Sequence, residues 1–125
     1  MQNFKELHIW QESMELVKEI YIITSAYPEA EKFGLVQQMR RAAVSIPSNI
    51  AEGAGRNSLL EFKRFLTISI SSSNELETQL GISEMMDFIE EDVSKELQHK
   101  INILRKRVYS FIKAIDHSTN TISKT

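Results

Sequence analysis

Apolar residues recur at helical spacing along four stretches of this chain. In the first, over residues 9–25, intervals of four, three and four residues place an apolar stripe along a helix: Trp10, Met14, Val17 and Tyr21. The stripe is widened by Leu16, Ile20 and Ile23. Pro28 ends that helix, because a proline disfavours helical geometry in the residue before it. The second stretch predicts a helix from about residue 32 or 34 to residue 53, where glycines provide the exit. Its core face is formed by Leu35, Met39, Ala42, Ile46 and Ile50.

The other two stretches are longer. Ser58 and Glu61 have capping-box spacing, in which the serine hydroxyl and the glutamate carboxylate each accept a hydrogen bond from a backbone amide. A third helix therefore begins there and continues to about residue 86, along a seam with small residues at its middle: Phe62, Phe65, Leu66, Ser69, Ser73, Leu76 and Leu80. The fourth helix is predicted over residues 92–116, on a narrow seam formed by Leu97, Ile101, Leu104, Val108, Phe111 and Ile115.

Four helices with short loops predict an all-α fold, an antiparallel up-and-down four-helix bundle, in one domain over residues 1–117. Residues 118–125 are expected to fray as a C-terminal tail. Pro47 lies inside the second helix, where its missing amide hydrogen and its ring favour a kink. Polar residues gather around it, and we expect their hydroxyl and amide groups to bind the carbonyl that a kink releases: Ser45, Ser48, Asn49 and Glu52.

The second helix has few charges even on the side opposite its core face. Opposite its core face, Arg41 is the one charged residue where a solvent-facing helix usually shows several Lys and Glu. The third helix carries no charge from residue 65 to residue 74. A second contact surface explains both features, so we expect a homo-oligomer whose interface includes Gln37, Val44, Ser48, Ala51, Ile68 and Ser71.

Composition limits the chemistry. The chain has no cysteine, which excludes disulfides, thiolate metal sites and cysteine nucleophiles and fits a reducing bacterial cytoplasm. No apolar run approaches the roughly 18 residues that span a bilayer, so no membrane association is expected. His8, His99 and His117 lack metal-ligand spacing, and no phosphate loop or nucleophile motif is present. We therefore expect no enzyme, metal, cofactor or small-molecule substrate, and we interpret the acidic residues from 75 to 92 as a solvated face.

A formal net charge of −2 conceals basic and acidic stretches. Residues 32–64 carry a net +4 and residues 99–125 a net +5, whereas residues 65–98 carry −7. The local field attracts a polyanion, so candidates for phosphate binding are the cations at both ends of the second-to-third helix hairpin: Arg40, Arg41, Arg56, Lys63 and Arg64. An equally weighted alternative pairs them with carboxylates such as Glu52, Glu61 and Glu75. For Lys100, Arg105, Lys106, Arg107 and Lys113, we favour solvation.

The segments FKELHIWQESMEL, YPEAEKFGLVQQMRRAAVSIPSNIAEGAGR and EFKRFLTISISSSNELETQL follow one another in that order. Over about residues 4–115 the chain thereby resembles the four-helix bundle family named for proteins encoded in intervening sequences of 23S ribosomal RNA genes. The family usually has Ala and Gly where this chain has Ser69 and Ser71. The side chains at these positions therefore stay small, but the contact between helices becomes more polar. The resemblance implies a ring-like homo-oligomer, expected to be a pentamer, similar to the accessory protein of diversity-generating retroelements, a basic barrel that binds nucleic acid.

Residues and resemblance together predict a non-enzymatic, oligomeric, cytoplasmic bundle that associates with RNA or another nucleic acid through the five cations of the hairpin. The slightly acidic total charge weighs against this function, because nucleic-acid binders often have excess basic charge. A structural or protein-interaction scaffold without a nucleic-acid ligand is the first alternative. The second is an enzyme that uses polar groups near Asn49 and Glu52, which would need a deep pocket.

Overall fold

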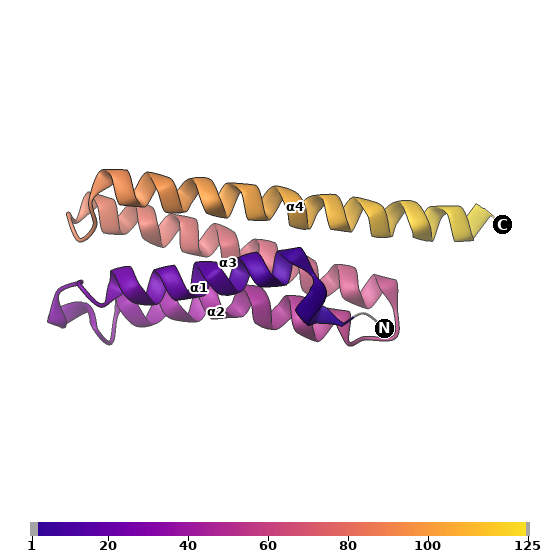
Figure 1. Cartoon of the computed structure of the whole chain (residues 1–125), viewed down its shortest axis with the longest axis horizontal. Coiled ribbons are helices and arrows are strands. Elements are labelled where there is room, and N and C mark those ends of the chain that lie inside the picture. The colour runs from indigo at the N-terminus through magenta and orange to yellow at the C-terminus, as the bar shows by residue number, and fades with distance from the viewer. Residues whose placement is uncertain (1–2, 125) are drawn as a thin grey trace.

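The computed structural model describes residues 3–124, with side chains through residue 118. Its α-helices are α1 (His8–Thr24), α2 (Leu35–Ala54), α3 (Leu59–Met85) and α4 (Glu91–Lys124), and the described residues contain no strand. Short 3-10 turns, η1 (Phe4–Glu6) and η2 (Glu29–Glu31), precede α1 and α2. The helices run antiparallel to their neighbours in sequence (Figure 1), which confirms the predicted all-α fold with four helices.

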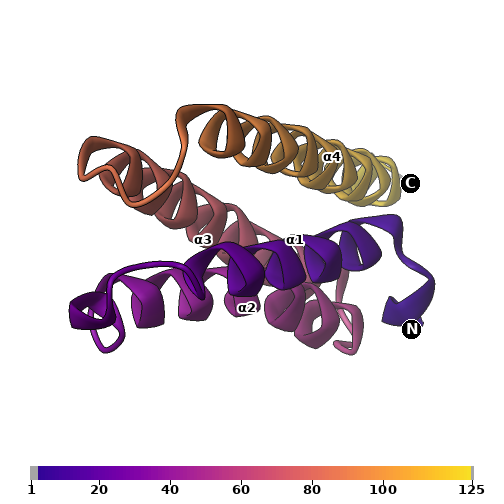
Figure 2. The same cartoon turned by 60° about the vertical axis from the view of Figure 1, so that its left-hand side comes forward.

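The helices follow one another around the bundle in chain order. The most extensive contact is between α2 and α3, and α1 packs against both α2 and α4. Figure 2 shows α1 beside α2, with α3 and α4 on the other side of the molecule. Within the described residues, the diagonal pairs α1 with α3 and α2 with α4 make no close backbone contact. This arrangement is that of an up-and-down bundle, whose core is lined by all four helices.

The helix ends follow local signals in the sequence. The Ser58 hydroxyl accepts a hydrogen bond of 3.3 Å from the Glu61 amide, which confirms the serine half of the capping box, whereas the Glu61 carboxylate lies 3.6 Å from Arg64. After α3, Asp87 adopts a φ of 59°, and the Phe88 amide donates to the Ser83 carbonyl over 2.9 Å. This left-handed turn reverses the chain toward α4.

The fourth helix is longer than predicted. It begins at Glu91, as expected, but continues past residue 116 to Lys124. Neither proline nor glycine follows residue 116, so no local signal stops the helix there. The expected frayed tail, residues 118–125, lies mostly outside the residues whose side chains are described and stays a prediction.

The predicted core faces are buried in α2 and α4, but the face of α1 is rotated. Its buried positions are Ile9, Ser13, Leu16, Ile20 and Thr24. Met14 and Tyr21 of the predicted stripe remain exposed at the edge toward α2. The rotation is possible because the buried hydroxyls bond within their own helix: Ser13 donates to the Trp10 carbonyl over 2.8 Å and Thr24 to the Ile20 carbonyl over 2.6 Å.

Polar groups surround Pro47, within a helix that continues from Leu35 to Ala54. The Asn49 amide donates to the Ser45 carbonyl over 2.8 Å, and the Ser69 hydroxyl of α3 donates to the Ile46 carbonyl over 3.0 Å. Side chains therefore bond carbonyls beside the proline, one of them from the neighbouring helix, but neither is the carbonyl of Ala43, which lacks its helical donor because Pro47 has no amide hydrogen. Glu52 is exposed and pairs with Arg56 instead. The kink itself stays a prediction.

One hydroxyl in the core has no partner. Tyr27 is buried, its ring centroid lies 5.7 Å from that of Phe88, and its hydroxyl forms no hydrogen bond with the described residues. Burial raises the pKa of Tyr27, and the nearby Ser83 hydroxyl offsets part of that rise. Ser83 itself donates to the Gln79 carbonyl over 2.8 Å. Tyr27 therefore contributes through its ring, at the end of the bundle where α1 and α3 finish.

Candidate nucleic-acid interface

The five cations of the α2–α3 hairpin do not form one cluster. Arg40 and Arg41 lie in the first half of α2, whereas Arg56, Lys63 and Arg64 lie around the turn into α3. At 1.5 Å per helical residue, about 20 Å of helix separates the two groups. The five cations therefore form two separate groups along the hairpin.

The three cations at the turn each have a carboxylate partner. Lys63 lies 2.7 Å from Asp116 of α4, and Arg56 lies 2.8 Å from Glu52. Arg56 also stacks over the Phe65 ring, 4.9 Å from its centroid. Arg64 has the most distant partner, Glu61 at 3.6 Å. Because nearby negative charges offset these cations, this end of the hairpin presents little net positive charge to a phosphate.

The basic stretch of α4 acts mainly between helices, contrary to the expected solvation. Arg105 donates to Asn74 over 2.8 Å and to Glu77 over 3.0 Å, both on α3. Arg107 pairs with Glu12 and Lys100 with Glu19, both on α1. The hydrogen bond that the Lys100 ammonium donates to the Glu19 carboxylate raises the pKa of Lys100. The expectation of solvation fits Lys106 and Lys113, which are exposed without a partner in the described part of the chain.

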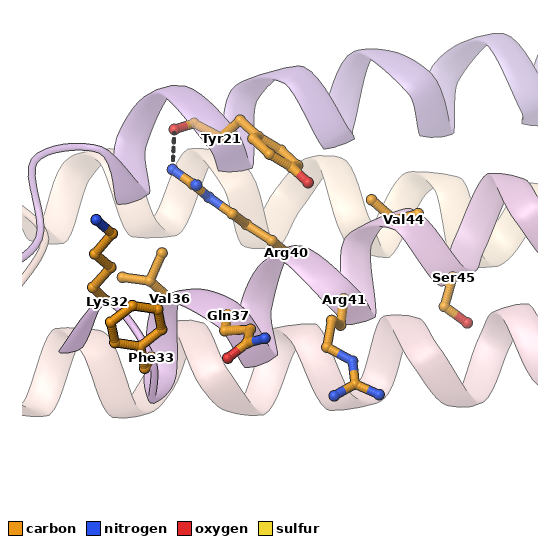
Figure 3. A pocket seen from close by; sticks show the side chains of 9 residues that line it. All are labelled: Tyr21, Lys32, Phe33, Val36, Gln37, Arg40, Arg41, Val44 and Ser45. Carbon is orange, nitrogen blue, oxygen red and sulfur yellow. Dashed lines mark hydrogen bonds between the residues drawn. The ribbon is translucent and has the colours of Figure 1, made fainter.

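The first half of α2 forms one wall of a groove of about 540 Å³, which we call the outer groove. Its lining contains three cations and no carboxylate (Figure 3): Tyr21, Lys32, Phe33, Val36, Gln37, Arg40, Arg41, Val44 and Ser45. Lys32 has only a distant partner, with Glu29 at 4.0 Å. The local charge of the outer groove is therefore positive, although the net charge of the chain is −2.

Arg40 is held in place by neutral groups of α1. Its Nε donates to the Thr24 hydroxyl over 3.0 Å, and its Nη2 donates to the Tyr21 carbonyl over 3.3 Å and to the Ser25 hydroxyl over 3.4 Å. The guanidinium carbon also lies 4.5 Å from the centroid of the Tyr21 ring. These contacts fix the orientation of the guanidinium without cancelling its charge.

Arg41 points away from Arg40, toward α3, in Figure 3. Its side chain is exposed and forms no ion pair or hydrogen bond with the described residues. Glu75 of α3 lines an adjoining groove with Arg41, at a separation too large for an ion pair. Arg41 is therefore the member of the predicted set that is both exposed and available to a ligand.

The predicted interface residues are accessible on the single chain. Gln37, Val44, Ser48, Ile68 and Ser71 are exposed, and Ala51 is half-buried. Gln37 and Val44 line the outer groove together with Arg40 and Arg41, so the predicted oligomer interface and the predicted phosphate site overlap at this point. The sequence alone does not place Tyr21, Lys32 and Phe33 beside the arginines. The adjacent pair Lys32 and Phe33 was the available signal, because a cation beside an exposed aromatic ring suits nucleic acids.

Evidence for a catalytic centre is lacking in the part of the chain that the structure describes. No group of three or more potential metal ligands occurs there. Asn49 bonds to Ser45, and the grooves on α2 include neither Asn49 nor Glu52 in their lining. No described helix is both long enough and apolar enough to span a bilayer.

Comparison with known proteins identifies the relatives of this bundle. The chain is similar to the crystal structure of a protein with unknown function from the S23 ribosomal protein family of Bacteroides thetaiotaomicron, with a TM-score of 0.76 and 24% identity, over 84% of this chain and 98% of that one. At this identity the likeness shows a shared fold. No curated protein matches the chain. Residues 5–110 match the family model described as 23S rRNA-intervening sequence protein, and the chain therefore belongs to that family.

Proposed function

We propose that this protein is a non-enzymatic helical bundle that associates with RNA through the outer groove of α2. The observation that carries the proposal is the lining of that groove, which contains Lys32, Arg40 and Arg41 but no carboxylate, the nearest partner being Glu29 at 4.0 Å from Lys32. A planar guanidinium binds phosphate through two parallel hydrogen bonds, and cations dominate the affinity of proteins for a nucleic-acid backbone. Arg56, Lys63 and Arg64 contribute less, because each already has an acidic partner.

The RNA proposal predicts a specific effect of Arg41. Replacing Arg41 with alanine is expected to weaken binding of a structured RNA severalfold and to reduce the slope of log affinity against log salt by about one. Lys106→Ala is the matched control, because Lys106 is exposed and unpaired but lies on α4. Fluorescence anisotropy over a salt series measures both variants. The absence of RNA binding at low salt, or equal losses in the two variants, would contradict the proposal.

We also propose that the protein forms a homo-oligomer in the cytoplasm, with a pentameric ring as the expected state. Exposed Ile68 and the small side chains of Ser48, Ala51 and Ser71, which lie outside the lining of the outer groove, support this, because they allow helices of neighbouring copies to approach closely. A ring would also bring several outer grooves into one assembly and strengthen RNA binding by multivalency.

The oligomer proposal predicts a mass of several times 14.4 kDa in light scattering at micromolar concentration. Ile68→Glu is expected to shift the assembly toward single chains, because it places a charge in the proposed interface without disturbing the core. Lys106→Glu is the matched control on α4 and should leave the mass unchanged. A mass near that of one chain for the unmodified protein would overturn the proposal.

A protein-interaction scaffold is the second candidate function. It is favoured by apolar side chains left exposed where α3 ends, above all Met85, which is 80% exposed, and its neighbour Met86. Methionine-rich surfaces adapt to varied partners. Isolation of the oligomer with one protein partner and without RNA would favour the scaffold over the RNA-binding function.

A further inference from the structure

Two aromatic side chains of the outer groove are accessible to a ligand. Phe33, directly before α2, is 83% exposed and is the most exposed large apolar residue in the described part of the chain. Tyr21, on α1, is also exposed, and Figure 3 shows the two rings apart from each other at the groove rather than stacked together. Both rings therefore leave aromatic surface free for contact with another molecule.

Each ring has a cation beside it. The Lys32 ammonium lies 5.6 Å from the centroid of the Phe33 ring, and the Arg40 guanidinium carbon lies 4.5 Å from that of Tyr21. Arg41 adds a third, unpaired cation within the same lining. Alternating aromatic rings and cations match the two parts of a nucleotide, because bases stack on the rings while phosphates meet the charges.

Base stacking distinguishes single strands from duplexes. In a duplex the faces of each base are covered by its neighbours, so a protein ring has no face to stack on; unpaired bases offer one. A surface that recognised only the phosphates of a duplex would need the cations but not exposed Phe33 and Tyr21. A second copy presenting the same groove would bring three cations against three, which repel one another. A single strand provides unpaired bases that stack on the rings and phosphates that bind the cations.

We infer that the outer groove binds unpaired RNA, with bases stacked on Phe33 and Tyr21 and phosphates held by Lys32 and Arg41. This inference rests on the proposed RNA-binding function and narrows it to single-stranded segments. Arg40 acts as a positioning residue, because its hydrogen bonds to Thr24, Tyr21 and Ser25 hold its guanidinium against the Tyr21 ring.

The test compares a fluorescein-labelled 12-nucleotide oligouridine with a blunt 12-base-pair RNA duplex, by anisotropy at one salt concentration and with the intact oligomer. Phe33→Ala is expected to weaken oligouridine binding by about fivefold or more and duplex binding by less than about twofold. Phe33→Trp should retain tight oligouridine binding, because it keeps a stacking surface. Leu60→Ala is the matched control, since Leu60 is also apolar and exposed but lies at the start of α3.

The outcomes separate this inference from the function on which it rests. If RNA binds and responds to Arg41→Ala while Phe33→Ala leaves oligouridine affinity unchanged, or matches Leu60→Ala, unpaired-base recognition is wrong and RNA association stands. If neither RNA binds, both are wrong. Light scattering and circular dichroism accompany each variant. A change of oligomer mass in Phe33→Ala would assign Phe33 to a subunit contact and overturn the inference.

Discussion

Replacing Gly53 with alanine is expected to lower the free energy of unfolding by about 1–2 kcal/mol, net of the helix-propensity gain, because α2 and α3 approach too closely for a side chain. A Cβ at position 53 would lie 2.8 Å from the Phe65 Cβ, 2.9 Å from the Phe62 Cδ1 and 3.2 Å from the Phe62 carbonyl oxygen. Two of these three contacts belong to the backbone or to the atom next to it. The clash therefore requires α3 itself to move, since a change of rotamer cannot relieve it.

Gly81 provides the matched control within α3. A Cβ built there has no neighbouring atom within 4 Å, so Gly81→Ala is expected to stabilise the helix by about 0.5–1 kcal/mol. Urea denaturation followed by circular dichroism measures both variants. Equal stability of the Gly53→Ala and Gly81→Ala variants would contradict the close approach of α2 and α3 at Gly53.

Arg105→Ala is expected to lower the free energy of unfolding by about 1.5–3 kcal/mol, because it removes hydrogen bonds from a charged donor in a largely buried setting. The Arg105 side chain is 17% exposed and bonds to Asn74 and Glu77 of α3, and to Asn102 of its own helix over 3.3 Å. Arg105→Lys should recover only part of the loss, since an ammonium cannot reproduce the planar fork that spans Asn74 and Glu77.

Arg107 provides a comparison that tests whether burial determines how far Arg105→Ala lowers the free energy of unfolding. It pairs with Glu12 across the α1–α4 contact, but its side chain is 57% exposed. Arg107→Ala should therefore cost at most about 1 kcal/mol, and added salt should reduce the cost. Equal losses for the two alanine variants in the same denaturation experiment would contradict the role assigned to the partly buried contacts of Arg105.

The glycines at the end of α2 have a different role in the structure from the one that the sequence predicts. The sequence predicts a helix exit at residues 53–55, and α2 indeed ends at Ala54 with Gly55 as its cap. Gly55 has a φ of −82°, however, so the helix end does not need the left-handed freedom of glycine. Gly53, two residues earlier, is required for a contact with Phe62 and Phe65, and only the packing of α2 on α3 reveals that requirement.

The candidate site was predictable only in part. Arg40 and Arg41 stand out because Glu52 is the only other charged residue of α2, and the structure places both arginines on the outer groove. The partners of Arg56, Lys63 and Arg105 could not be assigned from sequence, because Lys63 and Arg105 find theirs on another helix and Arg56 could equally have used Glu61 or Glu75. Tyr21 likewise reads as a core position by periodicity, yet it lies at the edge of α1 beside Arg40.

The sequence by itself determined the number of helices, most of their ends and the buried faces of α2 and α4, because periodicity, capping residues and helix-breaking residues act within a few positions of one another. Only the tertiary structure decided which arginines keep an uncompensated charge, which face of α1 is buried and why Gly53 has no side chain. These properties depend on distances between residues far apart in the chain, and helical spacing fixes a direction around one axis but not the neighbour found there.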